Sequence, residues 1–176
     1  MSLLKSIKKE EASGAVATVY EMMQQRVGFI PNVVKLHTAS PDLFEKFMSL
    51  VGHYTDHPSL DPVMVSYVRY LISSIENTTY CMKLQTAVLK NYNVTGEELS
   101  VAGRDYHEIA LDPKRKELVL FVMDMMYGKP GNTQKRIIQL KDLGWAEKDI
   151  YEMSMLGAIQ KGVVQLIKTF EIQPDF

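Results

Sequence analysis

The sequence predicts an all-α protein, folded as a single-domain helical bundle over residues 1–176. Apolar residues recur at helical spacing along most of the chain, beginning with Val16, Tyr20 and Met23. No alternating run of strand length competes with them. Dipeptides of a capping residue and a proline, which are typical of helix starts, occur three times: Ser40-Pro41, Asp61-Pro62 and Asp112-Pro113.

Each expected helix has a recognisable beginning or end. A capping box of Thr95 and Glu98 opens one of them, and a hydroxyl residue at Thr78 precedes another. Glycines and prolines end the apolar runs at Gly28 and Pro58. In chain order we expect helices over about 16–27, 41–57, 62–75 and 79–92, and a further helix that begins after Thr95. Three more follow over about 113–127, 137–143 and 147–170, the first of them ended by Gly128 and Pro130.

Composition excludes several classes of protein. The 176 residues fit one domain, and 46% apolar with 23% charged residues is ordinary for a globular protein. Twenty basic against twenty-one acidic residues give no electrostatic reason to expect a nucleic-acid partner. We also expect no membrane partner, because no segment resembles a signal peptide or a membrane span. One cysteine cannot form an internal disulfide, so the expected location is the cytoplasm.

Several motifs in the same order resemble one family. They are Gly28-Phe29-Ile30-Pro31-Asn32-Val33 followed by Ser40-Pro41-Asp42-Leu43-Phe44, then the segment 61–89, and Leu143-Gly144-Trp145-Ala146-Glu147-Lys148-Asp149-Ile150. Together they resemble the carboxymuconolactone decarboxylase and alkyl hydroperoxidase D superfamily, in its peroxidase-related branch. The resemblance covers about residues 28–170. It implies a helical bundle, a homo-oligomer built through the active-site helices, and a small pocket at the turn before Cys81.

The family's peroxidase site has the pattern E-x11-C-x2-C-x3-H. With Cys81 in the place of the second cysteine, this chain has Ser66, Thr78 and Gln85 where the family has glutamate, the first cysteine and histidine. The resemblance therefore identifies a degenerate C-x-x-C site. Ser, Thr and Gln keep hydrogen-bonding capacity but lose the acid/base and dithiol functions of the originals. We expect no cofactor.

Two interpretations of Cys81 remain open. In the first turn of a helix, with the Thr78 hydroxyl nearby, its thiolate would be favoured. Alternatively it is a small buried apolar residue, as unpaired cysteines often are. The leading hypothesis is a homo-oligomer that has lost the dithiol activity and binds a small ligand or partner through Ser66, Gln85 and Tyr80. The alternative is a one-cysteine hydroperoxide reductase, an antioxidant oxidoreductase with an external thiol donor, in which Cys81 and Thr78 are catalytic.

Two further activities are less favoured. A decarboxylase of a small cyclic acid would need a general acid or base, and position 85 offers none. His53 and His57 have the four-residue spacing of a metal-binding pair. They lie just before Pro58, however, where histidine is favourable at a helix end for ordinary reasons. We therefore expect no metal site.

Overall fold

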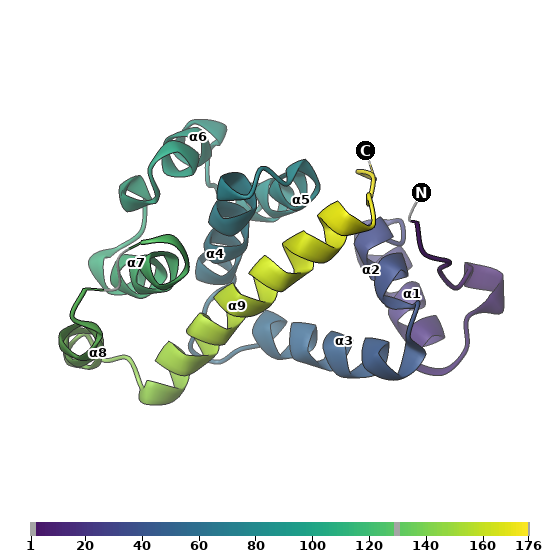
Figure 1. The fold of residues 1–176 in the computed structure, drawn as a ribbon, viewed down its shortest axis with the longest axis horizontal. Helices are drawn as coiled ribbons and strands as arrows, with labels where there is room; N and C mark the ends of the chain where they lie inside the picture. The colour runs from purple at the N-terminus through teal and green to yellow at the C-terminus, as the bar shows by residue number, and fades with distance from the viewer. Residues whose placement is uncertain (1–2, 129–130, 176) are drawn as a thin grey trace. The chain divides into compact units, whose positions relative to one another are not determined.

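The computed structural model describes residues 3–128 and 131–175, and this part of the chain forms helices and no strands. Pro130, expected to help end the preceding helix, lies outside the described residues. The helices, drawn in Figure 1, are η1 (Lys9–Glu11), α1 (Gly14–Val27), α2 (Asn32–His37), α3 (Pro41–Thr55), α4 (Pro62–Ile75), α5 (Thr79–Lys90), α6 (Gly96–Arg104), η2 (Tyr106–Glu108), α7 (Pro113–Tyr127), α8 (Thr133–Asp142) and α9 (Glu147–Thr169).

The predicted capped helix starts are confirmed in position, but two of the capping residues, Ser40 and Thr78, make no capping hydrogen bond. The helix expected over 137–143 begins earlier, at Thr133. Asp61 accepts hydrogen bonds from the backbone N–H groups of Val63 and Met64, and Asp112 accepts one from Arg115. Thr95 and Glu98 form the predicted capping box. The short helix α2 was not predicted.

The helices group into two compact units. One comprises residues 1–56 and 166–176, and the other comprises residues 57–165. We refer to them as the first and second units. That the whole chain acts as one domain stays a prediction.

The core of the first unit gathers apolar side chains from α1, α2, α3 and the loop before α2. The N-terminal segment is bound to this core through the backbone N–H and carbonyl groups of Ile7. The backbone N–H of Ile7 donates to the Thr38 hydroxyl at 2.9 Å, and its carbonyl accepts from the Tyr20 hydroxyl at 2.8 Å. Phe44 is fully buried here, and the cluster consists of Val16, Tyr20, Ile30, Val34 and Phe44.

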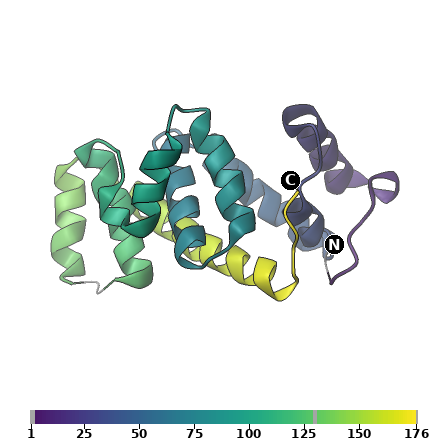
Figure 2. The same ribbon diagram turned by 90° about the horizontal axis from the view of Figure 1, so that it is seen from above.

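The second unit is organised around α4. This helix packs against α5, α6 and α7, and the views in Figures 1 and 2 show α4 and α5 side by side. Most of its side chains are buried, which explains its strongly apolar sequence. No described helix is both long and apolar enough to cross a bilayer.

Candidate functional site

A tight turn between α4 and α5 positions the candidate site. Asn77 has a φ of 53°, the left-handed conformation that Asn tolerates better than most residues. The backbone N–H of Thr78 then donates to the Ser73 carbonyl at 2.8 Å, closing the end of α4. Because α5 begins at Thr79, Cys81 lies in its first turn, as predicted.

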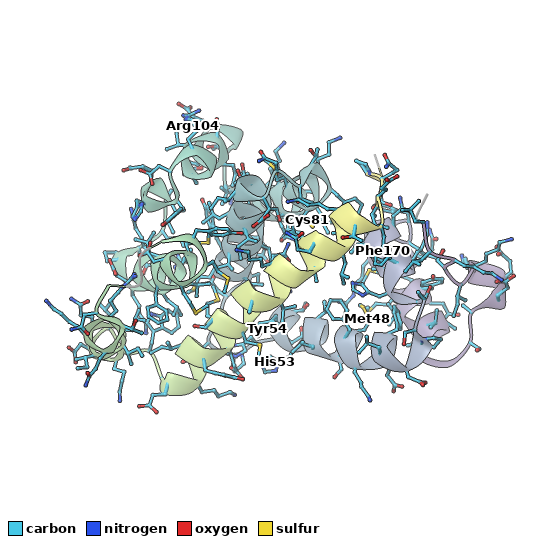
Figure 3. All side chains as sticks on the ribbon, in the orientation of Figure 1. Met48, His53, Tyr54, Cys81, Arg104 and Phe170 are labelled. Atoms are coloured by element: carbon cyan, nitrogen blue, oxygen red, sulfur yellow. The ribbon has the colours of Figure 1, made fainter. Side chains whose placement is uncertain are left out.

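The Cys81 thiol is buried in the second unit; the residue is labelled in Figure 3. Burial raises its pKa and is the largest influence on it. The polar side chains of Gln160 and Ser73, and the positive charge of Arg69, act to lower the pKa but have a smaller effect. The helix start favours a thiolate, but desolvation outweighs it, so the neutral thiol is the preferred form.

The two polar neighbours of Cys81 are also bonded to each other. The Ser73 hydroxyl donates to the Arg69 carbonyl at 2.6 Å and accepts from the Gln160 side-chain amide at 3.2 Å. A serine hydroxyl has one hydrogen to donate. Ser73 would have to give up the Arg69 carbonyl before it could donate to a thiolate, which again favours the thiol.

Thr78 directs its hydroxyl elsewhere. It donates to the Glu76 carbonyl at a long 3.4 Å, and the polar side chains that act to lower the pKa of Cys81 are those of Gln160 and Ser73 instead. Thr78 occupies the N-cap position of α5, but its side chain makes no capping hydrogen bond.

The three residues that we predicted to bind a ligand are all buried. Ser66, Tyr80 and Gln85 are at most 7% exposed. In the described part of the chain, the side chains of Ser66 and Gln85 make no hydrogen bond. Next to Ser66, the hydroxyl of the fully buried Tyr67 also has no described partner. Buried polar groups are normally paired, so the Tyr67 hydroxyl has unused hydrogen-bonding capacity.

The unpaired Tyr67 hydroxyl gives a testable expectation. We expect Tyr67→Phe to raise the free energy of unfolding by about 1 kcal/mol, because it removes a desolvated donor that gains no bond. Tyr70→Phe is the matched control on the same helix, since the Tyr70 hydroxyl donates to the Leu99 carbonyl at 3.0 Å. We expect that variant to lose about 1 kcal/mol in urea unfolding. Equal losses in both variants would show that Tyr67 has a partner.

Glu76 supplies a carboxylate at the turn, but its oxygens are already engaged. The Tyr127 hydroxyl donates to one of them at 3.0 Å, the Lys161 ammonium lies 3.8 Å from the same oxygen, and Gln165 donates to the other at 3.4 Å. Burial and the bond to this carboxylate raise the pKa of Tyr127. These contacts give Glu76 a structural role.

His57 also has structural partners. Its Nδ1 accepts from the backbone N–H groups of Ser59 at 3.1 Å and Leu60 at 2.9 Å. Its Nε2 therefore carries the proton and donates to Glu152 at 2.7 Å. Both ring nitrogens thus hold the loop before α4 in place. The absence of a metal stays a prediction.

Sequence reasoning missed Ser73 and Gln160, although a signal was present. Gln160 lies four residues after Leu156 and four before Val164, on the buried face of α9. Ser73 lies seven residues after Ser66, on the same face of α4. A polar residue on an apolar helical stripe is the pattern that identifies both.

Two solved structures resemble the chain over nearly its whole length. One is an alkylhydroperoxidase AhpD core, an uncharacterized peroxidase-related protein from Ralstonia eutropha JMP134, with a TM-score of 0.85, 15% identity and coverage of 99% of this chain and 92% of that chain. The other is an uncharacterized peroxidase-related protein from Silicibacter sp. TM1040, with a TM-score of 0.80, 15% identity and coverage of 99% and 95%. No family model and no curated protein matches the sequence.

At 15% identity, these structures establish the fold and not the chemistry. The predicted all-α class is confirmed, and so is the resemblance of fold that the motifs indicated. The chain has the alkyl hydroperoxidase D-like fold of peroxidase-related proteins.

Proposed function

We propose that this protein has lost the dithiol peroxidase cycle and binds a small ligand or a partner at the turn between α4 and α5. The observation that carries the proposal is the state of Cys81. It is the only cysteine of the chain, and it is buried with a raised pKa. A dithiol cycle needs a second thiol to resolve the oxidised one, and a peroxidatic cysteine needs an exposed thiolate.

The ligand-binding part of the proposal rests on the unpaired polar groups. Ser66, Tyr67 and Gln85 are buried on α4 and α5 without side-chain hydrogen bonds to described residues. A small molecule with hydroxyl or carbonyl groups would satisfy them, and burial would give each bond more weight than in water.

The proposal includes self-association in the cytoplasm. The two helices of the site leave apolar side chains exposed at their ends: Ile75 at the end of α4 is 38% exposed, and Tyr92 after α5 is 46% exposed. A second copy of the chain would remove these side chains from water.

A hydroperoxide assay tests the loss of activity. We expect the wild-type protein and Cys81→Ser to consume cumene hydroperoxide at the same background rate with dithiothreitol as donor, since no thiolate is presented to solvent. The readout is loss of hydroperoxide over time at pH 7 and pH 8. Turnover by the wild type that Cys81→Ser abolishes would contradict the proposal.

Such turnover would support the second candidate, a one-cysteine hydroperoxide reductase. The observation that favours this candidate is the set of groups that act to lower the pKa of Cys81, namely Gln160, Ser73 and Arg69. Hydroperoxide would oxidise the thiolate to a sulfenic acid and leave as an alcohol. Two equivalents of external thiol would then restore Cys81, releasing water and a disulfide.

A further inference from the structure

A hollow in the first unit has no part in the function proposed above. Its volume is about 640 Å³, within the range of small-molecule sites. The N-terminal segment, α1, the loop before α2, α2 and the C-terminal tail line it. The Gly28-to-Asn32 part of the motif that we singled out in the sequence forms one wall.

The C-terminal tail, which forms another wall, is hydrogen-bonded to Asn32 of that motif. Asp175 accepts a hydrogen bond from the backbone N–H of Asn32 at 2.8 Å, and the Asn32 side-chain amide donates to the Gln173 carbonyl at 3.1 Å. The N-terminal segment, which also lines the hollow, is held through the backbone of Ile7, which is bonded to Thr38 and Tyr20. The hollow is therefore bordered by segments fixed to the folded core.

Part of the lining is apolar. Ile30 belongs to the buried core of the first unit, and Ile7 packs against that core. Phe29 is half-buried beside them. Together these side chains offer an apolar surface on which a hydrocarbon or aromatic body would lie.

The charges around the hollow are not balanced. Lys8, Lys9 and Lys35 line it, against the carboxylates of Glu10 and Asp175. The Asp175 carboxylate is engaged by Asn32. Lys35 is a half-buried residue, and its ammonium donates to the Asn32 amide oxygen at 3.2 Å but forms no ion pair with any described residue. An ammonium at an apolar hollow that lacks a carboxylate partner favours an anion beside it.

We propose that this hollow binds a small organic anion, whose acidic group pairs with Lys35 and whose apolar body lies against Ile7, Phe29 and Ile30. The exposed residues Lys8 and Lys9 also line the hollow and add positive charge. The proposed ligand is a monocarboxylate with an apolar tail or ring, since the hollow combines an apolar wall with the Lys35 ammonium, which has no ion pair with a described residue.

Octanoate is a suitable probe, and 1-octanol is its uncharged control. We expect octanoate to bind the full-length protein and to shift the backbone amide signals of Phe29, Asn32 and Lys35 in an NMR titration. Lys35→Gln should weaken octanoate binding about tenfold, the effect of losing one charge-assisted bond. Lys35→Arg should retain most of it. Lys46→Gln, an exposed lysine on α3, is the matched control and should leave the affinity unchanged.

Three results would overturn the proposal. They are equal affinity for octanoate and 1-octanol, signal shifts confined to residues outside the hollow, and equal affinity in Lys35→Gln and Lys46→Gln. Cys81→Ser should leave octanoate binding unchanged, so the outcome is independent of the function proposed for the α4–α5 turn.

Discussion

We expect Cys81 of the native protein to react with iodoacetamide at pH 7 about a thousandfold more slowly than the same residue in guanidinium chloride, which corresponds to a local opening free energy of about 4 kcal/mol. Alkylation needs a thiolate in contact with the reagent. In the folded chain the thiol is buried and its pKa is raised, so both requirements oppose the reaction. Mass spectrometry of timed samples gives both rates.

The pH dependence of this reaction has a defined sign. The unfolded thiol titrates near its ordinary value of about 8.5, and the folded one titrates above it. The native rate should therefore continue to rise at pH values where the unfolded rate has levelled off. By linkage, the folded state holds the thiol proton more tightly, so this group's contribution to stability is lost as pH rises above the unfolded value.

Two variants identify which groups act on the sulfur. Thr78→Val should leave the midpoint of alkylation unchanged, because the Thr78 hydroxyl donates to the Glu76 carbonyl. Gln160→Leu should raise the midpoint further, because Gln160 acts to lower the pKa of Cys81. Complete modification under native conditions with a midpoint below about 8.5 would contradict our account and favour the one-cysteine reductase.

We expect Gly157→Leu to lower the free energy of unfolding by about 3 kcal/mol relative to Gly162→Leu. A Cβ atom at Gly157 would lie 2.6 Å from Cγ1 of Val122, with Met126 and Ile72 also within 4 Å. A leucine there would force α9 away from α7 and α4 within the second unit. Urea unfolding followed by circular dichroism measures the difference.

Gly162 is a close control for this substitution. It lies on the same helix, and a Cβ there would meet no described atom within 4 Å. Replacing either glycine improves helix propensity by up to about 1 kcal/mol, so the difference between the two variants isolates packing. Since Gln160 follows Gly157 by less than one turn, Gly157→Leu should also speed alkylation of Cys81. Stabilities within 0.5 kcal/mol of each other would show that α9 tolerates the added volume.

Helix starts were predictable because their causes are local. Asp61 and Asp112 bond to backbone N–H groups two or three residues away, and the proline that follows each already has the helical φ. The helix α2 was not predicted because it is short and has no capping side chain to mark its start. It has only six residues after Pro31, too few for apolar spacing to reveal a period.

The sequence by itself determined the helical class, the helix-start caps and the place of Cys81 in the first turn of α5, because these depend on residues close together in the chain. Only the tertiary structure decided the state of that thiol. A helix start favours the thiolate, but packing buries Cys81 and brings Gln160 of α9 to Ser73 of α4, 87 residues away in sequence. Desolvation depends on which distant side chains exclude water, and no local pattern records that.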